Sequence, residues 1–180
     1  MRCIPILSMS CWMQKPSSMG RVGRKRNDQR WQDPSGVIWA SKFEWEVYDT
    51  LNSSGLLIRR CDASDTIDYT EPKPNVSCVE CGSSRCAQNR TYTPDLYIVP
   101  SNAGSNSGGY YLEVKGYFRN EKRKLFRCLR ASRPDVDLRI VFSSDHWVTR
   151  GKTRLSDYFN NYVKNTPYHI WDGDLPEDWK

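Results

Sequence analysis

The sequence predicts an α/β fold in which a central mixed β-sheet is flanked by helices. Segments rich in apolar, β-branched and aromatic residues are predicted as strands at 56–60, 96–99, 110–114 and 138–142. Segments whose apolar residues recur at helical spacing are predicted as helices at 41–54, 120–133 and 155–164. The length of 180 residues suits a single domain with a substantial core.

Residues 1–35 are predicted to form a basic, flexible tail, and residues 36–180 the folded domain. The tail holds seven Lys or Arg residues and two Asp residues, so most of the net charge of +6 lies there. Its basic centre includes Arg24, Lys25 and Arg26. Basic tails commonly contact phosphate backbones, although a solvated leader that adds only solubility would have the same composition.

Membrane insertion and secretion are not indicated. No stretch approaches the roughly 18 apolar residues that a spanning helix needs. Residues 1–7 lack the apolar core and the cleavage site of a signal peptide. We therefore expect a cytoplasmic protein that has no membrane partner.

The first helix is predicted to begin at Ser41. Ser41 and Glu44 have the spacing of a capping box, and Phe43, Val47 and Leu51 form an apolar stripe. At 100° per residue, Glu44 falls about 40° from the centre of this stripe, so it borders the buried face. Capping alone would explain a glutamate at this position.

An insertion at about 61–90 is rich in cysteine. Seven cysteines, an odd number, in a chain without a signal peptide favour metal binding over disulfides. The C-x2-C-x4-C spacing resembles a zinc knuckle that would hold a structural Zn²⁺, with Cys61 as the best candidate for a fourth ligand. Reduced surface thiols are the alternative. The three cysteines of the knuckle are Cys78, Cys81 and Cys86.

The segment 91–116 is predicted to be a β-hairpin that carries the chemistry. Asp95 begins one strand, a Ser/Asn/Gly-rich loop follows at 100–109, and Glu113 and Lys115 lie in the second strand. Side chains alternate along a strand, so Glu113 and Lys115 project from one face, and the hairpin brings Asp95 to the same end. Two carboxylates and an ammonium that converge suit a Mg²⁺-type ion and a water that it activates.

The helix at 120–133 is predicted to be basic on one side and apolar on the other. Beside the hairpin we interpret its basic side as a surface that follows DNA phosphates, although a solvated basic face is the simpler explanation. Its candidate DNA-binding residues are Lys122, Arg123, Lys124, Arg127 and Arg130. The tail at 168–179 is expected to pack as an aromatic strap over the sheet. His146 and His169 are expected to serve packing or hydrogen bonding.

Several of these segments together resemble the bacteriophage endonuclease I family of PD-(D/E)xK nucleases. The matching segments are Thr91-Tyr92-Thr93-Pro94-Asp95, Glu113-Val114-Lys115-Gly116, the basic helix, and 137–144. The family includes the Holliday-junction resolvases of T7-like phages, and the resemblance covers about 41–179. It implies a restriction-endonuclease-like fold, with the nuclease domain at 36–180, and host cytoplasm as the location if the chain is phage-encoded.

The resemblance also implies roles for individual residues. Asp95, Glu113 and the Val114 carbonyl would bind Mg²⁺ or Mn²⁺, and Lys115 would position or deprotonate the attacking water. Glu44 matches a further acidic ligand, which in the family comes from the partner chain of a domain-swapped dimer. We therefore expect a homodimer and branched DNA as partners. The cysteine insertion departs from the family and leaves the domain swap open.

The predicted function is that of a metal-dependent endonuclease that resolves Holliday junctions and other branched DNA by phosphodiester hydrolysis. Another PD-(D/E)xK nuclease, such as a nickase or a restriction-like enzyme, would share Glu44, Asp95, Glu113 and Lys115. Only the resemblance to the family selects branched DNA. A zinc-stabilised DNA-binding protein that does not cut is a third reading. The intact set of Asp95, Glu113 and Lys115 argues against it, since a protein that only binds DNA needs no such set.

Overall fold

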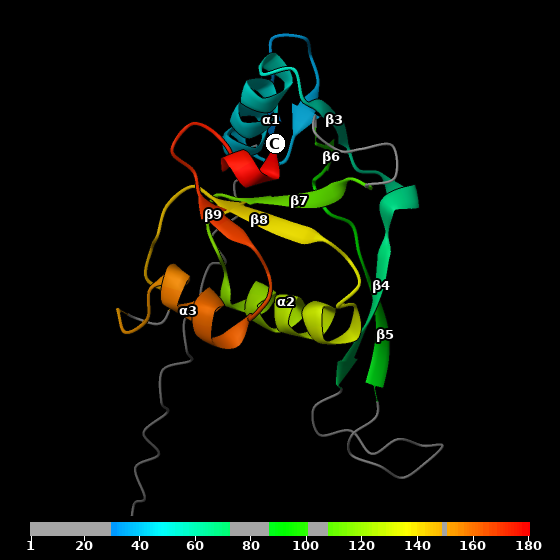
Figure 1. Cartoon of the computed structure of the whole chain (residues 1–180), viewed down its shortest axis with the longest axis vertical. Helices are drawn as coiled ribbons and strands as arrows, with labels where there is room; N and C mark the ends of the chain where they lie inside the picture. The colour runs from blue at the N-terminus through cyan, green and yellow to red at the C-terminus, as the bar shows by residue number, and fades with distance from the viewer. Residues whose placement is uncertain (1–29, 73–86, 101–107, 149–150) are drawn as a thin grey trace, which may run out of the picture.

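A mixed five-stranded sheet forms the centre of the protein in the computed structural model, which describes residues 30–72, 87–100, 108–148 and 151–180. The first three strands in the spatial order are antiparallel neighbours, and the last three are parallel neighbours. This arrangement confirms the predicted α/β class with a mixed sheet (Figure 1). The spatial order is β3 (Leu57–Arg60), β6 (Leu96–Val99), β7 (Tyr110–Lys115), β8 (Leu138–Phe142) and β9 (Tyr168–Ile170).

The helices cover both faces of the sheet. Helix α1 (Lys42–Ser53) lies over one face, and α2 (Asn120–Ser132) and α3 (Leu155–Tyr162) lie over the other (Figure 1). Alternation of side chains along the strands gives each face its own core. In β8, for example, Val141 belongs to the α1 core, whereas Ile140 belongs to the core under α2 and α3.

The start of α1 shows the Ser41 half of the predicted capping box, and its end follows the predicted glycine signal. The Glu44 amide donates to the Ser41 hydroxyl at 3.1 Å, which satisfies one of the unpaired amides of the first turn. Val47 and Leu51 of the apolar stripe are fully buried. Gly55, just beyond the helix, has a φ of +81°, a conformation that favours glycine.

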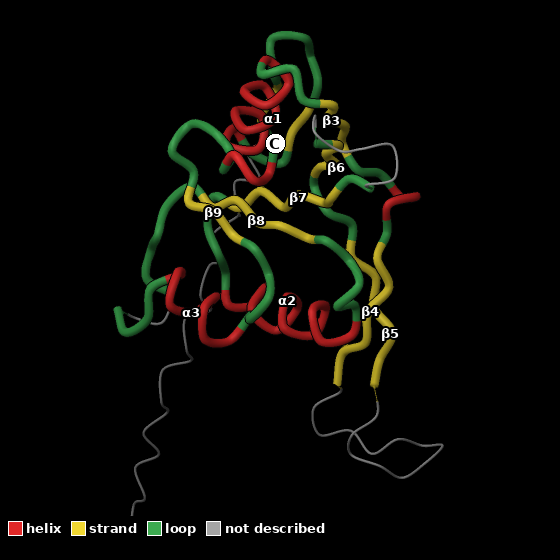
Figure 2. The backbone as a smooth tube through the Cα atoms, viewed as in Figure 1, coloured by secondary structure: helices red, strands yellow, loops and turns green. Residues whose placement is uncertain are grey.

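A two-stranded ribbon, β4 (Ile67–Pro72) and β5 (Ala87–Tyr92), forms part of the region where the insertion was predicted, and residues 73–86 of that region lie outside the described structure. A short 3₁₀ helix, η1 (Ala63–Asp65), precedes it. Figure 2 shows the ribbon running from the edge of the sheet alongside α2. The Thr70 amide donates to the Ser132 hydroxyl at 3.2 Å, which ties the ribbon to that helix.

The folded part begins earlier than predicted. Strands β1 (Trp31–Gln32) and β2 (Ile38–Trp39) form a small hairpin, so the boundary that we placed after residue 35 falls within its turn. The Asp33 carboxylate holds this turn by accepting hydrogen bonds from the Val37 amide and the Trp39 indole, both at 2.9 Å. The basic centre of the predicted tail, Arg24 to Arg26, lies outside the described residues.

The C-terminal segment is only partly the strap that the sequence suggested. Its first residues form β9, an edge strand that runs parallel to β8. Tyr168 of β9 pairs with Ile140 of β8. The last turn, η2 (Glu177–Trp179), does pack on the sheet: Trp179 is buried, and its carbonyl accepts from the Tyr110 hydroxyl at 2.8 Å. Among the residues that the structure describes, no helix has both the length and the apolar character needed to span a bilayer.

Candidate functional site

The pairing of β6 with β7 assembles the candidate site. Leu96 lies opposite Leu112, which brings Asp95, the residue before β6, next to the end of β7. The Val114 amide donates to the Asp95 carboxylate at 2.7 Å, so the backbone of one strand fixes the side chain at the start of the other. The convergence of Asp95, Glu113 and Lys115 predicted for the hairpin is therefore present in the structure.

The Lys115 ammonium gathers the oxygen atoms of this site. Its Nζ lies 3.2 Å from Asp95 Oδ2 and 3.2 Å from the Val114 carbonyl, and it forms an ion pair with Glu113 Oε1. These groups are the ones that the sequence led us to expect around a divalent cation. The site thus already concentrates three oxygen donors around one positive charge.

Burial disfavours the charged form of the Glu113 carboxylate. The side chain is fully buried, and this burial, together with the negative charge of Asp95, raises the pKa of Glu113 to about 7, although Lys115 opposes the shift. Burial lowers the pKa of Lys115, but the carboxylates of Glu113 and Asp95 outweigh it, so the net pKa lies above its ordinary value. Lys115 is therefore held as an ammonium ion.

Glu44 contributes a further negative charge to the same end of the sheet. It is buried near the start of α1, and its pKa is raised by burial and by the charge of Asp95, while Lys115 and Arg60 oppose this shift. Glu44 and Asp95 of one chain are thus close enough to repel each other electrostatically.

The oxygen atoms at the site suit a hard divalent cation. Among the described residues, the second carboxylate oxygen of Glu113, Oε2, is buried without a well-formed hydrogen bond, although the Tyr92 hydroxyl lies close enough to lower the pKa of Glu113. Carboxylate and carbonyl oxygens favour Mg²⁺ or Mn²⁺ over softer metals. Within the described ranges, no three Asp, Glu, His or Cys side chains are grouped so that they could hold a metal ion together, so a backbone oxygen such as the Val114 carbonyl would have to join Asp95 and Glu113.

Tyr92 is a site residue that the sequence did not reveal. Its ring lies at the end of β5, and its buried hydroxyl lacks a hydrogen-bond partner in the described structure. Burial and the neighbouring charge of Glu113 raise the pKa of Tyr92 well above its ordinary value. Tyr92 belongs to the matching segment before Asp95, but no spacing rule there indicates that its hydroxyl turns toward Glu113.

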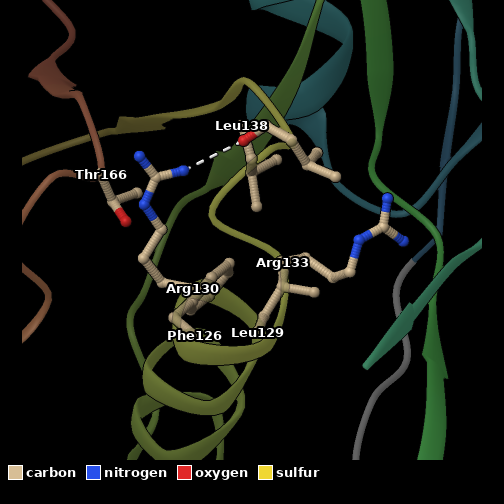
Figure 3. Close-up of a pocket in the computed structure, with 7 residues that line it drawn as sticks. Phe126, Leu129, Arg130, Arg133, Leu138 and Thr166 are labelled. Atoms are coloured by element: carbon tan, nitrogen blue, oxygen red, sulfur yellow. Dashed lines mark hydrogen bonds between the residues drawn. The ribbon is translucent and has the colours of Figure 1, made fainter. Parts of the chain in front are cut away.

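The basic residues of α2 do not form one uniform surface. Lys124 pairs with Glu71 of the ribbon at 2.5 Å. Arg130 turns back to donate to the Val136 carbonyl at 3.0 Å, as Figure 3 shows. Arg127 is exposed. Two further cations lie over aromatic rings: Lys122 over Tyr92 at 5.6 Å and Arg123 over Tyr158 at 5.5 Å.

A cavity of about 10 Å³ lies beneath α2, lined in part by Phe126, Leu129, Arg130 and Leu138 (Figure 3). It lies near Leu138, at the end of β8 away from the residue that pairs with Lys115. This volume holds one water molecule at most. The cavity is therefore too small to bind a substrate.

Cys61 lies beside the carboxylates of the site. Its amide donates to the Asp95 carbonyl at 3.0 Å, and burial, with the charge of Asp65, raises its pKa to about 12. Pro72 and Ala87 pair at the far end of the ribbon. By the length of a six-residue strand, that end lies about 17 Å from the end at which Ile67 pairs with Tyr92. The segment between Pro72 and Ala87, outside the described structure, holds the other proposed zinc ligands: Cys78, Cys81 and Cys86.

Comparison with known proteins gives a partial similarity. No protein-family model matches the chain. Among curated proteins, Endonuclease I of Escherichia phage T7 is 40% identical over 58 residues. This stretch covers 32% of the chain and 34% of the phage protein, so the chain spans about a third of the length of that relative. The fold and site are those of a mixed α/β protein with convergent carboxylates and a lysine, and the similarity supports a relation to nucleases.

Proposed function

We propose that this protein is a metal-dependent DNA endonuclease that resolves Holliday junctions and other branched DNA by hydrolysis of phosphodiester bonds. The observation that carries the proposal is the convergence of Asp95, Glu113 and the Val114 carbonyl around Lys115 at the end of two paired strands. Partial similarity to a phage endonuclease supports it.

Asp95, Glu113 and the Val114 carbonyl would hold a Mg²⁺ or Mn²⁺ ion, and Glu44 would serve a second metal position. Such an ion supplies Lewis-acid chemistry and neutralises charge on the scissile phosphate. The Val114 amide fixes the Asp95 carboxylate, so this part of the ligand set is oriented before the ion arrives. The Oε2 atom of Glu113 is available for the same purpose.

Lys115 acts as a cation in this scheme. Its carboxylate neighbours raise its pKa above the ordinary value, so in the chain alone Lys115 is a hydrogen-bond donor. The attacking water forms a new bond to phosphorus and loses a proton to the solvent, while the bond to the leaving 3′-oxygen breaks and that oxygen takes up a proton from the solvent. Lys115 orients that water or stabilises the negative charge that develops on the phosphate oxygens.

The proposed preference for branched DNA depends on more than the residues of the site. The residues at the site do not distinguish a junction from a duplex, so shape must supply the distinction. A homodimer would set two such sites against two strands of a branch point, and its two-fold symmetry would match the symmetry of a four-way junction. The exposed Arg127 and the basic N-terminal residues would add contacts to phosphates.

The test compares cleavage of a synthetic four-way junction with cleavage of a linear duplex of matched sequence, with Mg²⁺ and with EDTA. We expect paired nicks in the junction alone, and none with EDTA. Equal cutting of both substrates would retain the hydrolytic chemistry and reject junction selectivity, which is the nickase or restriction-like alternative. Absence of cutting in Mg²⁺ and Mn²⁺ would reject the nuclease proposal itself.

A further inference from the structure

An exposed aromatic side chain lies immediately beyond the catalytic strand. Tyr117 follows Lys115 by two residues and is 64% exposed, a large fraction for a tyrosine next to a buried site. One face of its ring is covered by the imidazole of His146, with ring centroids 4.6 Å apart and planes within 17° of parallel. The exposed fraction of Tyr117 leaves aromatic surface accessible to a ligand.

His146 is held rigidly beneath this ring. Its Nε2 accepts from the Phe118 amide at 3.2 Å, so Nδ1 carries the proton and lies 3.2 Å from the Ser144 carbonyl. Phe118 itself is fully buried and packs against Phe142. Because both nitrogens are engaged, the imidazole is fixed and orients Tyr117.

The position of Tyr117 relative to Lys115 is also fixed. The Ser143 amide donates to the Lys115 carbonyl at 3.2 Å, and the Ser143 hydroxyl donates to the Gly116 carbonyl at 2.6 Å. Because Tyr117 is two residues after Lys115, the Cα atoms of these two residues lie at most about 7 Å apart. A group that stacks on Tyr117 would therefore lie about one nucleotide from a phosphate at Lys115.

We propose that the Tyr117–His146 pair is a stacking platform for an unpaired nucleobase that flanks the scissile phosphate. The inference rests on the proposed nuclease function and adds a subsite to it. A base within a duplex has both faces covered by its neighbours, so the platform accepts a base at a branch point, bulge or single-stranded end. Stacking on an aromatic ring requires no particular base.

The charges around the platform match a nucleic-acid strand. Arg119 and Arg154 are exposed nearby in the chain, and the Arg154 guanidinium lies 4.3 Å from the ring centroid of the half-exposed Trp147. Trp147 directly follows His146, so a cation–aromatic contact lies next to the platform in the chain. Positive charge interleaved with aromatic faces is typical of sites that bind single strands.

The experiment uses the full chain and a duplex that carries a single unpaired 2-aminopurine, whose fluorescence falls when the base stacks. In EDTA, where no cleavage is expected, the wild type should quench the probe. Tyr117→Ala should abolish quenching at saturating protein and weaken binding of the bulged duplex by about 5- to 100-fold. Tyr117→Phe should behave as the wild type.

Tyr162 supplies the matched control, because it is 60% exposed on α3 and packs against Tyr158 instead of His146. Tyr162→Ala should leave quenching unchanged. Equal quenching by Tyr117→Ala and the wild type would overturn the platform, as would failure of the wild type to quench or to bind the probe. Quenching by a wild type that does not cleave DNA in Mg²⁺ would retain the platform and reject the nuclease proposal.

Discussion

Two clusters of acidic and basic side chains lie near each other in this protein, and their chemistry differs. In one, Arg59 donates to both carboxylate oxygens of Asp65 at 2.6 Å, and the Asp62 amide donates at 3.0 Å. The side-chain hydrogen bonds from Arg59 lower the pKa of Asp65 to about 2. In the other, Glu113 has a pKa of about 7, and one of its oxygens is buried without a well-formed hydrogen bond among the described residues.

The Asp65 carboxylate therefore stabilises the fold, whereas the charged form of the Glu113 carboxylate is disfavoured in the folded chain. Asp65 is buried but satisfied by its protein partners, so its charged form is favoured in the folded chain. Glu113 loses hydration without a full set of partners, and Asp95 repels it. Carboxylates left in this condition are typical of sites that await a cation or a substrate.

The largest expected effect concerns the site cluster. Asp95→Asn or Lys115→Ala should reduce cleavage by at least about a thousandfold, since each removes a charge that the reaction needs. Binding of the junction should survive, as measured by gel shift in EDTA. Asp49→Asn, at an exposed position of α1, is the control and should cleave normally. Loss of binding in either site variant would show that the site supports the fold instead of the chemistry.

Tyr92→Phe would sharpen the comparison within the site. It removes only the hydroxyl that faces Glu113, so we expect cleavage to fall by about 10- to 100-fold and the Mg²⁺ concentration for half-maximal activity to rise. Tyr69 is similarly buried on the partner strand of the ribbon, so Tyr69→Phe is the matched control. Similar activities for the two variants would exclude a role for the Tyr92 hydroxyl.

The distinction between satisfied and available charges extends to α2. Arg127→Ala should weaken DNA binding and reduce the slope of log K against log salt by about 0.9, the value for one phosphate contact. Because Lys124 pairs with Glu71, its replacement should chiefly weaken the attachment of the ribbon to α2. Lys124→Ala should therefore leave the salt slope unchanged. Identical slopes for Arg127→Ala and the wild type would remove Arg127 from the DNA surface.

The smallest effect is expected at the satisfied cluster. Asp65→Asn should lower the free energy of unfolding by about 1–2 kcal/mol, because Arg59 is half exposed and its pair is partly screened. The folded-state pKa lies below the ordinary value of 3.8, so this contribution is present above pH 4 and is lost as the pH falls toward 2. Thermal unfolding of the variant and the wild type at pH 7 and pH 2.5 should show the difference shrinking at acid pH.

Local patterns were sufficient to predict the pairing of β6 with β7 and the main helices. Strands at 96–99 and 138–142 match the structure because each is a short apolar run that begins directly after an Asp residue. The hairpin at 31–39 was missed since its two-residue strands depend on the Asp33 side chain. The partner of Lys124 was missed for a related reason: Glu71 is distant in the chain, and helical periodicity carries no information about it.

The strand pairing that holds Asp95 against Val114 has an evolutionary consequence. Three cross-strand pairs between β6 and β7 set the positions of both carboxylates, and all three lie within residues 96–98 and 110–112. Proteins descended from a common ancestor could therefore gain or lose residues in this connection while the site stays in place. Sequence searches that require a fixed number of residues between the aspartate and the glutamate would miss such relatives, whereas searches by strand register would detect them.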